Sequence, residues 1–120
     1  MTGPVHVDRA KLDDLRALER PGHEGFLKRI ATVFLDDADR RLDEMDRGLE
    51  NNDTDAVVMA AHALKGSCSY LGATRLAELC SAFEERADQG NLEAGTEAAG
   101  EIRRELATVK AVLTEEMDKA

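Results

Sequence analysis

Residues 53–72 read DTDAVVMAAHALKGSCSYLG, and this stretch decides the fold. Its apolar side chains recur at spacings of four, three, four and three residues, as they do along one face of an α-helix. These positions are Val57, Ala61, Leu64, Cys68 and Leu71. Gly72 follows the last of them, and glycine commonly ends a helix. The pattern predicts an amphipathic helix from about residue 53 to residue 71 that buries one face.

Similar stripes predict long helices on both sides of this segment. They are expected over residues 24–50, over 73–89, and from Asn91, the expected N-cap, towards the C-terminus. In the first, the apolar positions are Phe26, Ile30, Val33, Phe34, Ala38, Leu42, Met45 and Leu49. In the second, they are Leu76, Leu79, Cys80, Phe83 and Ala87. In the third, they are Ile102, Leu106, Val109, Leu113 and Met117.

A short helix over residues 8–19 is expected before these, with Asp8 as its N-cap and Leu12, Leu15 and Leu18 as its apolar positions. Pro21 and Gly22 then break the pattern. Four long amphipathic helices with short connections predict an all-α fold, an antiparallel up-and-down four-helix bundle with a short extra N-terminal helix. We expect one domain over residues 1–120, with residues 1–7 and 118–120 frayed. The compact length and Met1 favour a free-standing protein.

The charge of the chain narrows the classes of partner. Asp plus Glu number 25 and Lys plus Arg 16, so the formal net charge is 16 − 25 = −9. Such a chain repels the phosphates of nucleic acids and the headgroups of anionic membranes. No apolar run reaches the roughly 18 residues of a membrane span, and no signal-peptide pattern opens the chain. We therefore expect a cytoplasmic protein whose two cysteines are reduced core residues.

The three histidines differ in their expected setting. His6 falls in the segment expected to fray and His23 beside the break, so both are expected to be solvated surface side chains. His62 lies about 100° around the helix from Ala61, so it leaves the core and reaches the flank. The positions three and four residues from His62 are Val58, Met59, Lys65 and Gly66, which are not metal ligands. We expect neither a metal site nor a hydrolytic triad at this histidine.

The neighbours of His62 suggest an accessible surface. Gly66 lowers helix stability by about 1 kcal/mol relative to alanine, so a glycine there points to a packing or functional reason. We interpret it as space for a partner beside the imidazole. Lys65 supplies a cation three residues from His62. The small side chain of Ser69 leaves the next turn of the helix without a bulky group on the same surface. Val58 and Met59 are apolar flank positions that indicate a partner-facing patch, unless the N-terminal helix covers them.

One carboxylate is expected to reach the imidazole from the next helix. Ten residues separate His62 from Gly72, about 15 Å of helix rise. An antiparallel helix returns to the same level near Glu84, the flank residue next to Phe83. A carboxylate there could accept a hydrogen bond from Nδ1–H and leave Nε2 as the free nitrogen. The alternative is that Glu84 is an ordinary solvated charge beside Glu85.

The segment from His62 to Ala73 resembles the signature of histidine-containing phosphotransfer (HPt) domains of bacterial two-component phosphorelays. That signature is His, any residue, Leu, Lys, Gly, then a stretch of small residues and Leu-Gly-Ala. The matching positions are His62, Leu64, Lys65, Gly66, Leu71, Gly72 and Ala73. The rest of the chain resembles the family in length and helix count, since the family fold is also a four-helix bundle with a short N-terminal helix.

The resemblance implies that His62 is a phosphoacceptor, that Lys65 stabilises the phosphoryl group, and that Gly66 leaves room for the docking partner. The position of Glu84 matches that of a Gln or Glu that hydrogen-bonds the imidazole in many family members. Expected partners are receiver domains of response regulators and a histidine or hybrid kinase. The chain would be a monomeric phosphoryl carrier without its own cofactor or kinase site, with Mg²⁺ held by the receiver. The rival hypotheses are a helical adaptor that carries no phosphate, and a purely structural or dimerisation bundle.

Overall fold

The computed structural model describes residues 6–19, 21–22, 25–93 and 95–118. The helices are α1 (Arg9–Arg16), α2 (Phe26–Glu50), α3 (Thr54–Leu71), α4 (Thr74–Asp88) and α5 (Gly95–Asp118). The described residues contain no β-strand. The predicted all-α class and the short N-terminal helix are confirmed.

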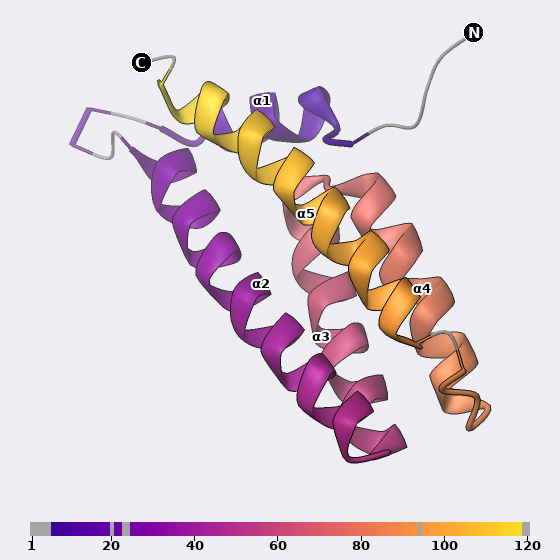
Figure 1. Ribbon diagram of the computed structural model, residues 1–120. Coiled ribbons are helices and arrows are strands. Elements are labelled where there is room, and N and C mark those ends of the chain that lie inside the picture. Colours follow the sequence, from indigo (N-terminus) through magenta and orange to yellow (C-terminus); the bar gives the residue numbers. More distant parts are fainter. Residues whose placement is uncertain (1–5, 20, 23–24, 94, 119–120) are drawn as a thin grey trace, which may run out of the picture.

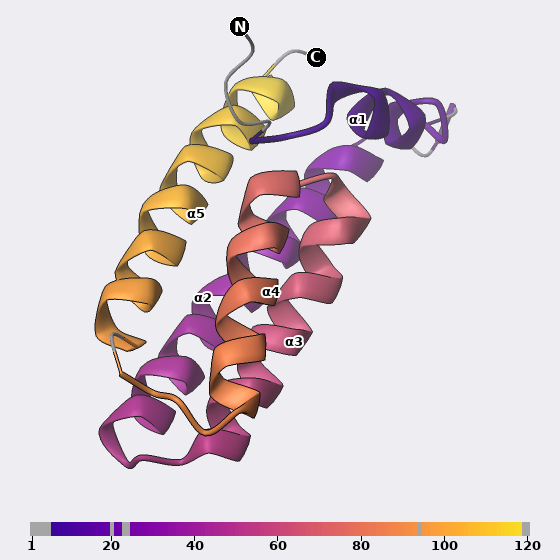
Figure 2. The same ribbon diagram turned by 90° about the vertical axis from the view of Figure 1, so that its right-hand side faces the viewer.

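The four long helices form the bundle. α3 packs against α2 and α4, and α5 packs against the same two helices. Figures 1 and 2 show these helices side by side with alternating directions, while α1 lies across one end of the bundle. The five predicted core positions of α3 are all buried, in the same core as Leu76 and Phe83 of α4 and Ile102 of α5. The side of α3 that carries His62 therefore stands outside the core.

Of the three helix-end residues predicted from the sequence, Asp8 and Gly72 act as expected and Asn91 does not. Asp8 Oδ1 accepts a hydrogen bond from the Ala10 N–H at 3.0 Å, and Asp53 Oδ1 accepts one from the Ala56 N–H at 3.1 Å. Gly72 ends α3 with φ +75°. The expected N-cap role of Asn91 is wrong, because its side chain accepts from the Glu93 N–H within a turn and α5 begins only at Gly95.

Gly72 is also the point at which the N-terminal segment touches the bundle. The Asp8 N–H donates to the Gly72 carbonyl oxygen at 2.7 Å. A Cβ added at Gly72 would lie 2.9 Å from Lys11 Cβ and 3.1 Å from Asp8 Cβ. Both the left-handed backbone and the close approach of α1 thus require glycine here.

Two predicted core positions are wrong. Val33 of α2 is 68 % exposed, and Leu27 and Ala31 are buried in its place at that end of the helix. The N-terminal half of α2 is apolar over a wide arc: Phe34 of the predicted stripe is buried, and Phe26 and Ile30 pack partly buried against the core, but Val33 faces outward. Leu18 is 52 % exposed because α1 ends at Arg16, so Leu18 no longer follows the helical face.

Long-range ion pairs hold the N-terminal segment in place. Val7 is buried, and His6 Nδ1 lies 2.6 Å from Glu105 Oε2 of α5. Arg16 Nη2 lies 2.6 Å from Glu116 Oε2, and Arg9 also contacts this carboxylate. The expected fraying of residues 1–7 therefore does not extend to His6 and Val7. Residues 1–5 and 119–120, together with His23, lie outside the described residues.

The cysteines are free and buried in the core, as expected. A hydrogen bond to Cys80, together with burial, raises the pKa of the Cys68 thiol, so this thiol stays protonated and unreactive. Among the described residues, no helix is both long and apolar enough to cross a bilayer.

Candidate functional site

His62 projects from α3 with 69 % of its side chain exposed. Its Nδ1 lies 3.0 Å from Glu84 Oε2 and 3.1 Å from Oε1, so the predicted contact with α4 is present. Because a carboxylate only accepts, Nδ1 must carry the proton. The neutral ring then has its lone pair on Nε2, the geometry of a nucleophilic imidazole.

Lys65 shares the same carboxylate. Its Nζ lies 3.1 Å from Glu84 Oε1, so one oxygen of Glu84 faces both the lysine and the imidazole. Partial desolvation opposes ionisation of Glu84, but hydrogen bonds from Lys65 and His62 outweigh it and lower the pKa of this carboxyl below its ordinary value. The site thus places the Glu84 carboxylate beside Nδ1 and a cation one helical turn from the imidazole.

Gly66 opens the surface on the other side of the imidazole. A Cβ added there would meet no atom within 4 Å, and Gly66 has no left-handed backbone that would require glycine. Internal packing therefore gives no reason for this glycine. The expected open surface one turn from His62 is present.

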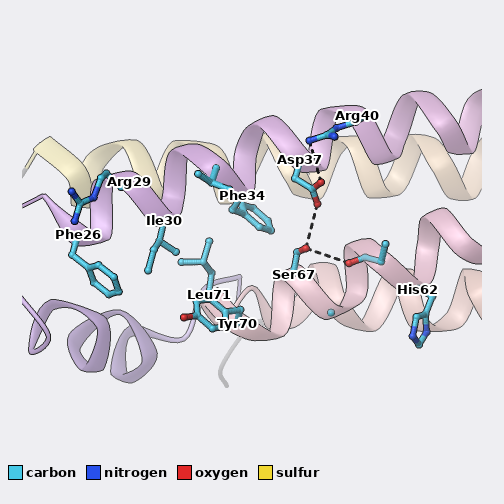
Figure 3. A pocket seen from close by; sticks show the side chains of 13 residues that line it. Phe26, Arg29, Ile30, Phe34, Asp37, Arg40, His62, Ser67, Tyr70 and Leu71 are labelled. Carbon is cyan, nitrogen blue, oxygen red and sulfur yellow. Dashed lines mark hydrogen bonds and ion pairs between the residues drawn. The ribbon is translucent and has the colours of Figure 1, made fainter.

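A groove of about 770 Å³ runs between α2 and α3 and reaches His62. From α2 it is lined by Phe26, Arg29, Ile30, Val33, Phe34, Asp37 and Arg40. From α3 it is lined by His62, Ala63, Gly66, Ser67, Tyr70 and Leu71. Figure 3 shows the apolar side chains of the two helices facing each other, with His62 at one end. An apolar groove that ends at an exposed histidine is suited to dock a partner surface.

The groove differs from the predicted partner-facing patch of Val58, Met59, Lys65, Gly66 and Ser69, which stays a prediction. Of its expected members, only Gly66 lines the groove. Val58 packs against the core, while Lys65 and Ser69 line a second hollow towards α1 and α4. Met59 is 72 % exposed, so the alternative that the N-terminal helix covers it is wrong.

Sequence reasoning missed the α2 side of the groove. Val33 and Tyr70 are 68 % and 58 % exposed, and Phe26 and Ile30 are half-buried at its wall. A signal for them was present: α2 has apolar residues at 26, 30 and 33 beside a second set at 27, 31 and 34. Two adjacent stripes on one helix indicate one face for the core and one for a partner.

Comparison with known proteins decides the family. The model of the Hpt domain family matches residues 29–112, well over half of the chain, and this span includes His62, Lys65 and Glu84. The chain belongs to the Hpt domain family. Among the described residues, no group of three or more His, Cys, Asp or Glu side chains is placed to hold a metal ion.

Relatives of this Hpt domain include proteins of two kinds. The chain is 31 % identical over 98 residues to histidine-containing phosphotransfer protein 1 of Arabidopsis thaliana, covering 80 % of this chain and 64 % of that protein. It is 29 % identical over 112 residues to pseudo histidine-containing phosphotransfer protein 1 of Oryza sativa subsp. japonica, covering 92 % and 58 %. The chain therefore spans less than two thirds of the length of these plant relatives.

Solved structures of similar proteins cover nearly the whole chain. Histidine-containing phosphotransfer protein B from Pseudomonas aeruginosa PAO1 matches with a TM-score of 0.88 at 26 % identity, over 98 % of this chain and 99 % of that one. A histidine-containing phosphotransfer protein from maize matches with a TM-score of 0.82 at 26 % identity, over 96 % and 91 %.

Proposed function

We propose that this Hpt domain carries a phosphoryl group on Nε2 of His62 and relays it in two-component signalling. The donor is the phospho-aspartate of a receiver domain, or a histidine kinase, and the acceptor is the aspartate of another receiver. The observation that carries the proposal is the exposed imidazole whose Nδ1–H is held by Glu84 at 3.0 Å. This hydrogen bond supports Nε2 as the attacking atom.

The transfer step balances without another reactant. The Nε2 lone pair forms a bond to phosphorus while the bond from phosphorus to the aspartyl oxygen breaks, and the carboxylate leaves with the electron pair. The Nδ1 proton stays on the ring, whose positive charge is stabilised by Glu84. Lys65, one turn away, supplies a cation for the phosphoryl oxygens. The reverse step returns the group to a second receiver.

The partner supplies the rest of the chemistry. We assign the Mg²⁺ ion and the remaining catalytic groups to the receiver domain, so the chain acts as a carrier without a cofactor, kinase site or ATP site of its own. The groove between α2 and α3 is the surface on which the receiver docks, because it is apolar and ends at His62. We propose that the protein works as a cytoplasmic monomer.

The rival is an adaptor that binds receivers or kinases without carrying phosphate. It is worth testing because some relatives are named pseudo histidine-containing phosphotransfer proteins. Membership of the family therefore does not decide between the two functions. What decides between them is whether His62 accepts a phosphoryl group.

The test is phosphate transfer from a purified receiver domain that has been loaded with acetyl phosphate and Mg²⁺. Wild-type protein should acquire an acid-labile, base-stable phosphate, and His62→Gln should acquire none. His6→Gln is the matched control, because His6 contacts Glu105 on α5 and lines no part of the groove. Phosphate retained by His62→Gln would overturn the assignment. Receiver binding without any phosphate on the wild-type protein would establish the adaptor.

A further inference from the structure

The groove has a charge opposite to that of the molecule. The chain carries a formal charge of −9, but the groove lining contains two arginines, Arg29 and Arg40, and one carboxylate, Asp37. The Asp37 carboxylate is already occupied. Arg40 Nη2 lies 3.5 Å from it, Arg41 Nε lies 3.6 Å from it, and the Ser67 hydroxyl donates to it at 3.4 Å. The lining therefore has a local excess of positive charge.

The two arginines lie at opposite ends of the α2 wall. They are eleven residues apart, which is close to three full turns, so they share one face and stand about 16 Å apart along the helix. Figure 3 shows Arg29 beside Phe26 at one end and Arg40 beyond Asp37 at the other. Among the described residues Arg29 has no ion-pair partner, and the side chain of Arg40 is 67 % exposed. Arg29 is therefore unpaired within the described part of the chain, whereas Arg40 is exposed but also pairs with Asp37.

Ile30 and Val33 lie between the two arginines and give the wall an apolar centre. In protein interfaces the apolar centre supplies most of the affinity, while charges at the rim set partner choice, orientation and association rate. The net charge of the molecule repels an acidic partner, while the local positive charge of the groove attracts it. The electric field of these charges would orient an approaching partner towards the end of the groove at which His62 lies.

We propose that Arg29 and Arg40 select among receiver domains. The preferred receiver has a docking face with an apolar centre flanked by carboxylates about 16 Å apart, matching the spacing of the arginines along α2. This inference rests on the proposed function, since it names the chemistry of the receiver that this groove accepts.

The experiment uses the full chain and a panel of purified receiver domains. The receiver that takes phosphate fastest from the wild-type protein is then titrated against Arg29→Glu and Arg40→Glu at several salt concentrations. Lys28→Glu and Arg47→Glu are charge controls, because both residues are exposed on α2 outside the groove. Within the described residues they form no ion pair, as is true of Arg29, whereas Arg40 pairs with Asp37. Each of the four variants changes the net charge from −9 to −11, so a general field effect would appear equally in all of them.

We expect each arginine reversal to weaken binding about three- to tenfold, mainly through a slower association rate, with the loss shrinking as salt rises. The control reversals should stay within about twofold of wild type. An arginine introduced at a flanking carboxylate of the receiver should restore binding to one of the two groove variants. Circular dichroism and melting curves establish that the variants are folded.

Two results would overturn the inference. One is wild-type affinity for the receiver after either arginine reversal, and the other is equal losses in the arginine and control variants. Failure of the proposed function has a different signature. In that case the wild-type protein accepts no phosphate on His62, either from any receiver or from phosphoramidate, a small donor that needs no docking surface.

Discussion

Substitutions of Gly66 should change the stability of the fold and the rate of phosphoryl transfer in opposite directions. A Cβ at this mid-helix position meets no atom within 4 Å, so the strain that usually follows Gly→Ala in a packed helix is absent. Only the intrinsic helix preference remains, and Gly66→Ala should raise the free energy of unfolding by about 1 kcal/mol. For a chain of this length, that corresponds to a melting temperature about 4 °C higher. Gly66→Gln should gain a few tenths of a kcal/mol up to about 0.7 kcal/mol, since glutamine is a slightly weaker helix former.

The same glutamine should impair function. Its side chain would fill the groove beside His62, so receiver docking and phosphoryl transfer should fall while stability rises. A structural or dimerisation bundle gives no reason for that combination. The assay pairs thermal unfolding with the rate of phosphate transfer from a loaded receiver.

Two other helical glycines serve as controls. Gly100→Ala on α5 would place its Cβ 3.5 Å from Arg104 Nη1, an ordinary contact, so it should stabilise the fold and leave transfer unchanged. Gly48→Ala would bring its Cβ within 2.8 Å of Val57 Cγ2 and 3.2 Å of Val57 N, so it should destabilise the fold by about 1–3 kcal/mol. The reasoning is refuted if Gly66→Gln is stable and transfers phosphate at the wild-type rate, or if Gly66→Ala gains no stability.

Four further predictions concern the charged groups. Lys65→Ala should slow transfer or shorten the lifetime of the phosphorylated His62, with little change in melting temperature. Wild-type transfer rates in both directions in this variant would show that Lys65 takes no part in transfer. Glu84→Ala should allow the His62 proton to redistribute between Nδ1 and Nε2, visible in ¹⁵N shifts of the ring, whereas Glu84→Gln keeps an acceptor and should change the tautomer less. The pKa of Glu84 is lowered from 4.5, so its ionised form stabilises the fold above pH 4.5, and this stabilisation is lost as the pH falls through the lowered pKa. The difference in melting temperature between wild type and Glu84→Gln should therefore vanish below the lowered pKa. Glu116→Gln should cost about 1–3 kcal/mol in urea unfolding, because the carboxylate is 3 % exposed and holds Arg16, and an unchanged midpoint would contradict this.

The features that the sequence predicted correctly depend on short stretches of chain or on the fixed geometry of the α-helix. The stripe of α3 is buried as expected, Asp8 caps its helix, and helix rise placed Glu84 level with His62. Each of these features depends on a few residues of one helix or on the fixed geometry of two antiparallel helices. They could therefore be inferred before any tertiary contact was known.

The features that escaped prediction depend on contacts between distant parts of the chain. Periodicity shows that α2 is apolar over a wide arc, but it cannot tell whether Leu27 or Val33 faces the core. Glu105 and Glu116 look like solvated charges of α5 in the sequence. They are buried because His6 and Arg16 reach them across about 100 residues of chain. Only the tertiary arrangement brings those charges together.

The position of α3 between two neighbours explains how one helix can serve chemistry and recognition separately. On one flank, α4 supplies Glu84, which holds His62 and Lys65. On the other flank, α2 supplies the groove wall that carries Arg29. The two sets share no hydrogen-bond or ion-pair partner among the described residues. Their effects on transfer should therefore multiply, with Glu84→Ala acting on the chemical step and Arg29→Glu on encounter with the receiver. If the double variant transfers phosphate no more slowly than the slower of the two single variants, docking and chemistry are not independent in this bundle.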